Sequence, residues 1–104
     1  MEKVIRNGNV AVLVSIGYGA GWYSWNTEHK ELLYHPKVVD MVENNRQSEI
    51  DEEWCEEQLG LHNIYCGGAT DLTIKWIPQG TAFKIDEYDG AESIITQDDF
   101  DGMA

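Results

Sequence analysis

The sequence predicts an α+β domain in which two helices are inserted between the strands of a mainly antiparallel sheet of about six strands. Three observations favour this fold class. Strand-like apolar patterns occupy both ends of the chain, whereas helix-like spacing is confined to its middle. Asn7-Gly8 and Asp89-Gly90 are typical turns of tight β-hairpins. No linker or internal repeat interrupts the 104 residues, so residues 1–104 are expected to form a single domain.

The first hairpin is predicted to join strands at residues 3–7 and 9–16. The second of these strands contains the run Val-Ala-Val-Leu-Val at residues 10–14, which is apolar on both faces. Such a strand lies centrally, covered by helices or by another subunit. Together with four tryptophans in a short chain, it predicts at least a dimer. Two further short strands are expected at residues 22–25 and 31–34.

Two helices are predicted in the middle of the chain. Pro36 suits the first turn of the first helix, which should end near residues 44–45. Ser48 precedes Asp51 by three residues, a capping-box-like arrangement for the start of the second helix, and Gly60 is its expected end. Alternating apolar residues then predict strands at 72–76, 83–86 and 93–95, followed by a loosely docked end at 97–102.

The charge balance argues against nucleic acid as a direct partner. Nineteen acidic residues against seven basic ones give a net charge of -12. The electrostatic field of this negative charge repels the phosphates of nucleic acid. No apolar run approaches the roughly 20 residues that cross a bilayer. The first residues lack a signal peptide's apolar block, so a cytoplasmic protein without membrane contact is expected. Cys55 and Cys66 are then expected to be reduced thiols, and without a close partner histidine they predict no metal site.

Residues 17–25 carry the strongest functional pattern. Three alternating glycines lie between aromatic residues, directly after the most apolar segment. A strand that ends in this way exposes backbone N–H groups and lets another surface approach closely. The neighbouring rings offer flat faces for stacking. The pattern predicts either a cradle for a flat ligand that carries phosphate or a bulged bend where the sheet turns back on itself.

A second cluster, residues 86–93, places four carboxylates across seven residues. These carboxylates could accept hydrogen bonds from the hydroxyl groups of a ribose or bind a divalent cation. They are also typical of a solvated hairpin tip that charge keeps soluble. In the ligand hypothesis, aromatic rings stack on a base, glycine amides and an arginine hold phosphate, and two carboxylates hold hydroxyls. The predicted ligand-binding residues are Arg6, Tyr18, Gly19, Ala20, Gly21, Trp22, Phe83, Glu87 and Asp89.

No residues stand out as catalytic. The acidic residues are too many for any pair of them to indicate general acid–base chemistry. A Cys/His nucleophile would need a third, orienting group, and none is evident near Cys66 and His62. The sequence therefore predicts a protein that is not an enzyme and uses no cofactor.

Residues 3–13, 17–22 and 87–93 resemble segments of small phage-encoded proteins. Among these, the chain is similar in size and element order to the anti-Thoeris sponge proteins. The resemblance implies a small antiparallel domain with two inserted helices that assembles as a dimer or higher oligomer. It further implies that the protein sequesters a cyclic ADP-ribose type of immune signal in the host cytosol without cleaving it.

Three functions follow from these observations. The first is a phage anti-defence protein that binds a small nucleotide signal. The second is an acidic inhibitor of the anti-CRISPR or anti-restriction kind, which blocks a nucleic-acid-binding host defence protein by protein–protein contact. The third is a nucleotide-cleaving enzyme. Salt separates the first two, because binding to a basic channel should weaken sharply as ionic strength rises.

Overall fold

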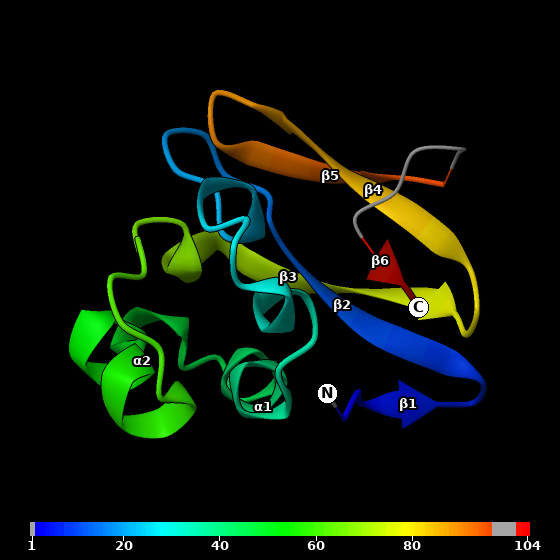
Figure 1. Ribbon diagram of the computed structural model, residues 1–104, viewed down its shortest axis with the longest axis horizontal. Coiled ribbons are helices and arrows are strands. Elements are labelled where there is room, and N and C mark those ends of the chain that lie inside the picture. Colours follow the sequence, from blue (N-terminus) through cyan, green and yellow to red (C-terminus); the bar gives the residue numbers. More distant parts are fainter. Residues whose placement is uncertain (1, 97–101) are drawn as a thin grey trace.

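The computed structural model describes residues 2–96 and 102–104. Its strands form two separate antiparallel sheets (Figure 1). The first sheet has the order β1 (Ile5–Arg6), β2 (Asn9–Ser15) and β3 (Leu72–Pro78). The second is a hairpin with a two-residue strand on its other side, in the order β5 (Ala91–Ile95), β4 (Ala82–Tyr88) and β6 (Gly102–Met103).

The predicted single sheet of about six strands is wrong, and only the α+β class remains. Two of the expected strands are 3-10 helices, η1 (Tyr23–Trp25) and η2 (Lys30–Leu33). Their aromatic and aliphatic residues are typical of strands. However, Trp22 Nε1 donates to the Leu32 carbonyl at 2.9 Å, which draws the two turns together. In the fully described segment between β2 and β3, no strand forms.

The prediction that β2 is central is confirmed, since β1 and β3 pair with it on either side. The side chains of residues 10–14 are completely buried, on both faces of the strand. Segments from both halves of the chain cover it, because η2 and β5 both contact β2. The chain therefore buries this strand by itself. A homo-oligomer stays a prediction, and this apolar strand no longer requires one.

The two predicted helices are present, with a different cap on the second. The first begins at Pro36 as expected, and the second ends at Gly60, whose φ of +69° is left-handed. Ser48 does not cap the second helix but lies in the 3-10 turn η3 (Gln47–Glu49). The cap is Asp51, whose Oδ1 accepts from the Trp54 amide at 2.8 Å. The bounds are α1 (Pro36–Glu43) and α2 (Glu52–Leu59).

Stability should fall in mild acid because of His35. Its Nδ1 accepts from the Lys37 amide at 3.2 Å and so caps α1. Partial burial and the Lys37 charge lower the pKa of His35 from its usual value of about 6.5. The unfolded chain therefore binds this proton more readily, so the stabilisation is complete above about pH 6.5 and is lost as the pH falls through the folded-state pKa.

We expect urea unfolding to reveal a loss of about 0.5–1 kcal/mol from this cap at acid pH. His35→Asn keeps an acceptor that does not titrate, so it should flatten the decline. His62→Asn should retain the decline, because His62 is exposed and lies outside α1. An equal decline in His35→Asn would contradict the assignment.

The expectation of a loosely docked end falls mainly on residues 97–101, which lie outside the described residues. The residues that follow are placed: Gly102–Met103 form β6, in which Gly102 pairs with Phe83 of β4. The Lys3 ammonium donates to the Met103 carbonyl at 2.5 Å, so this strand also contacts the N-terminal segment. The two ends of the chain thus meet beside β4.

Candidate functional site

A buried carboxylate holds the glycine-rich segment in place. Glu92 of β5 is only 4% exposed. Its Oε1 accepts from the Ser15 amide at 2.8 Å. Its Oε2 accepts from the Trp22 amide at 2.9 Å and from both the amide and the hydroxyl of Ser24, at 2.8 and 2.6 Å. Charge-assisted hydrogen bonds of this kind are strong. The backbone donors around the glycine run therefore bind an anion that belongs to the protein itself.

The glycines are also accounted for by close packing. The Gly19 amide donates to the Asp89 carbonyl at 2.5 Å. Gly90 has a φ of +87°, and a Cβ there would overlap the backbone of Ala20. A Cβ on Gly68 would lie 2.6 Å from the Gly21 carbonyl oxygen. The glycines therefore allow close packing of the β4–β5 turn and of residue 68 against the segment that follows β2.

Two of the aromatic rings predicted to stack on a ligand lie inside the core. Trp22 and Phe83 are both 0% exposed. The Trp22 indole donates to a backbone carbonyl of η2, and the Phe83 ring packs edge-on against Tyr34 with centroids 6.2 Å apart. In this structure neither ring presents a face to solvent.

Arg6 lies far from the glycine run, on β1 at the opposite end of the molecule (Figure 1). Its guanidinium donates to both carboxylate oxygens of Glu43, at 2.5 and 2.8 Å. It also lies 5.3 Å from the centroid of the Trp76 ring. This pairing raises the pKa of Arg6 and lowers that of Glu43. The structure thus does not bring Arg6 to the other predicted ligand contacts.

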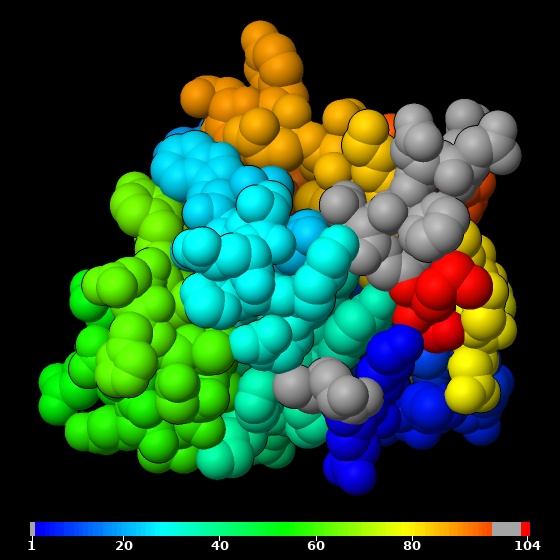
Figure 2. All heavy atoms as spheres, viewed as in Figure 1, coloured from blue at the N-terminus to red at the C-terminus, as the bar shows by residue number. Residues whose placement is uncertain are grey.

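The remaining predicted residues meet at one end of the molecule, where the β4–β5 turn lies against the loop after β2. Tyr18 in this loop is 74% exposed, and Tyr88, the last residue of β4, is 77% exposed. Figure 2 shows the hairpin (orange) as a projecting edge next to the segment near residue 20 (light blue). We define the aromatic–acidic end as Tyr18, Trp25, Tyr65, Asp86, Glu87, Tyr88 and Asp89.

Two rings of this end were missed from the sequence. The Trp25 indole donates to Glu87 Oε2 at 3.2 Å, and its ring lies 5.0 Å from that of Tyr65. Asn26 fixes the Tyr65 backbone by accepting from its amide at 2.9 Å and donating to its carbonyl at 3.0 Å. Aromatic residues beside a turn were the available signal for Trp25. No local pattern relates Tyr65 to a residue 39 positions away.

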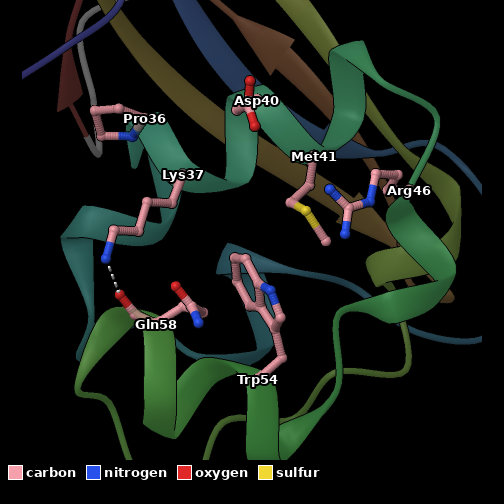
Figure 3. Close-up of a pocket in the computed structure, with 7 residues that line it drawn as sticks. All are labelled: Pro36, Lys37, Asp40, Met41, Arg46, Trp54 and Gln58. Atoms are coloured by element: carbon pink, nitrogen blue, oxygen red, sulfur yellow. Dashed lines mark hydrogen bonds between the residues drawn. The ribbon is translucent and has the colours of Figure 1, made fainter.

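A second region is a pocket of about 470 Å³ between α1 and α2 (Figure 3). Met41 of α1 and Trp54 of α2 face each other across it. Two of the seven basic residues line it: Lys37 donates to the Gln58 carbonyl at 2.8 Å, and Arg46 makes two 2.8 Å hydrogen bonds to Glu49. The full lining is Pro36, Lys37, Asp40, Met41, Arg46, Trp54 and Gln58. An aromatic face and two cations therefore share one cavity.

Neither geometry nor similarity assigns a known activity to these regions. Among residues 2–96 and 102–104, no group of three or more His, Cys, Asp and Glu side chains is arranged to hold a metal ion. No helix in the same ranges is both long and apolar enough to cross a membrane. No family model matches the chain, and no curated protein or solved structure matches it either.

Proposed function

We propose that this protein binds a basic surface of another protein through its aromatic–acidic end and so excludes nucleic acid from that surface. The observation that carries the proposal is the gathering of exposed rings and carboxylates at one projecting end. This is the second of the three functions that the sequence suggests, the acidic inhibitor, and we assign it to the aromatic–acidic end.

Charge and aromaticity play different parts in such binding. A net charge of -12 steers the molecule toward basic partners and accelerates encounter. Tyrosine and tryptophan are enriched among the residues that carry most of the energy of protein interfaces. Tyr18 and Tyr88 are the most exposed rings of this end and would be the first to be buried by a partner.

Hydrogen bonds within the chain fix the aromatic–acidic end in the absence of a partner. Glu92 anchors η1, the Gly19 amide joins the loop to the turn, and Asn26 fixes Tyr65. Glu87 Oε2 also accepts from the Gly90 amide at 2.6 Å, which fixes the turn itself. A surface ordered in advance loses less conformational entropy on binding.

Tyr18→Ala with Tyr88→Ala should abolish inhibition without unfolding the protein. Hot-spot rings each contribute about 2 kcal/mol, so the double variant should bind roughly 1000-fold more weakly. The measurement is displacement of labelled duplex DNA from a panel of purified CRISPR effectors and restriction enzymes. Displacement by the unaltered protein should also weaken as salt rises.

The matched control is Trp76→Ala, which removes a ring that is 38% exposed on β3, outside the aromatic–acidic end. It should displace DNA as well as the unaltered protein does. Failure to displace DNA from any panel member, or full displacement by the double tyrosine variant, would contradict the proposal.

A second candidate function, sequestration of a host nucleotide signal of the cyclic ADP-ribose type, is favoured by the pocket between α1 and α2. There the base would stack on Trp54, and base stacking on an aromatic ring contributes about 1–3 kcal/mol. Arg46 would exchange Glu49 for a phosphate, with Lys37 nearby. This function places the protein in the host cytosol, as a homo-oligomer that leaves its ligand intact.

Calorimetry with cyclic ADP-ribose isomers tests this second function. Trp54→Ala and Arg46→Gln should each weaken binding by about 10-fold or more, through loss of stacking or of a charge-assisted hydrogen bond. Trp76→Ala and Arg6→Gln are matched controls, since they change an exposed tryptophan and an Arg–Glu pair elsewhere. Absence of heat with every isomer contradicts sequestration, and recovery of altered ligand would indicate an enzyme instead.

A further inference from the structure

Two cysteines from different segments lie side by side. Cys55 is on α2 and fully buried, while Cys66 is partly exposed in the connection between α2 and η4 (Ala69–Asp71). Their sulfur atoms are 3.7 Å apart. We propose that Cys55 and Cys66 form an oxidative modification site, a dithiol that a small-molecule disulfide converts to an intramolecular disulfide. This inference does not depend on the proposed function.

The geometry suits this reaction. The two sulfur atoms are already in contact, and a disulfide requires them to approach to about 2.05 Å. Cys55 lies on α2, and the Cys66 carbonyl accepts from the Ala69 amide at 3.0 Å, so the remaining approach is expected to come from rotation of the two side chains.

The two thiols differ in the way that such a reaction requires. The contact between the two thiols lowers the pKa of Cys66, and the same contact together with burial raises the pKa of Cys55. The thiolate is the nucleophile in disulfide exchange. Cys66, the more accessible and more acidic thiol, therefore attacks first, and Cys55 completes the reaction.

The electron balance is that of two successive exchanges. The Cys66 thiolate attacks one sulfur of the small disulfide, which forms a mixed disulfide and releases one thiolate. The Cys55 sulfur then attacks the Cys66 sulfur and displaces the second thiolate, which takes up the Cys55 proton as it leaves. The two protein thiols lose two electrons and two protons, and the small disulfide becomes two thiols.

The product would tie α2 to the segment that presents Tyr65. Cys66 is the next residue after Tyr65, whose backbone is already held by Asn26. A disulfide closing a loop between positions 11 residues apart restricts the unfolded chain and stabilises the folded one. Oxidation should therefore raise the thermal midpoint by several degrees.

Cystamine is the probe for the experiment, because its positive charges suit an acidic protein. Mass spectrometry of the reduced protein treated with cystamine should reveal loss of two hydrogens and no retained adduct. Cys55→Ala should instead accumulate an adduct on Cys66. Cys66→Ala should react at least 10-fold more slowly, because Cys55 is buried. A lasting adduct on the unaltered protein, or first reaction at Cys55, would overturn the proposal.

The thermal midpoint of the unaltered protein tests the proposal without any cysteine variant, in case a variant does not fold. The unaltered protein, oxidised and then reduced with dithiothreitol, provides both states from one sample. Its thermal midpoint should rise on oxidation and return on reduction. A lower midpoint in the oxidised form would overturn the proposal, because it would mean that the folded geometry does not fit the bridge.

Discussion

Replacement of Glu92 by alanine is expected to lower the free energy of unfolding by about 4 kcal/mol or more. Three backbone amides and the Ser24 hydroxyl donate to this carboxylate, and alanine leaves all of them without it. Each buried donor left unpaired costs about 1–3 kcal/mol. The variant also leaves a cavity between β5 and β2, which contact each other. Urea unfolding followed by tryptophan fluorescence measures the loss.

Glu92→Gln separates hydrogen bonding from packing. Glutamine fills the same volume, but whichever way its amide turns, the NH₂ group meets at least one backbone donor. We expect a loss of about 2 kcal/mol. Glu57→Gln, on the exposed surface of α2, is the matched control and should change stability by less than about 0.5 kcal/mol. Equal stability of Glu92→Gln and the unaltered protein would contradict the role of Glu92.

Gly90→Ala is expected to destabilise the protein by about 3 kcal/mol, from backbone strain and steric overlap together. The position has a φ of +87°, and its Cβ would overlap the backbone of Ala20. The loop that carries Tyr18 would have to move away from the β4–β5 turn. The same variant should therefore weaken binding through the aromatic–acidic end.

Gly80→Ala is a closely matched control. Its φ is +88°, and a Cβ there meets nothing within 4 Å. Gly80→Ala should lower the free energy of unfolding only by the backbone strain, about 1–2 kcal/mol, and should retain binding through the aromatic–acidic end. If the two alanine variants were equally stable by urea unfolding, close packing of the turn against the glycine run would be disproved.

Local features of the fold were predictable because their causes lie within a few residues. Asn7 and Asp89 have φ values of +53° and +50°, and the glycine after each is also left-handed, as the Asn-Gly and Asp-Gly turns require. Pro36 and Gly60 bound the two helices for similar local reasons. The apolar run of β2 indicated its central position through burial on both faces.

The glycine run was harder to interpret because its partner lies far along the chain. The donors of Ser15, Trp22 and Ser24 find their acceptor 68 to 77 positions later, on Glu92. In the sequence this carboxylate is one of several in an acidic hairpin, with nothing to distinguish a buried member from solvated ones. Trp22 likewise reads as an exposed strand residue until its bond to the Leu32 carbonyl is known.

The reliance on Glu92 has a consequence for the order of folding during synthesis. A nascent chain can close the β1–β2 hairpin as soon as it leaves the ribosome, because that contact is local. The glycine-rich segment must wait until β5 has emerged, since its acceptor is carried there. Such high contact order slows folding and leaves apolar surface uncovered in the interval. The apolar strand β2 is therefore expected to gain its cover from β5 only when the last hairpin is released.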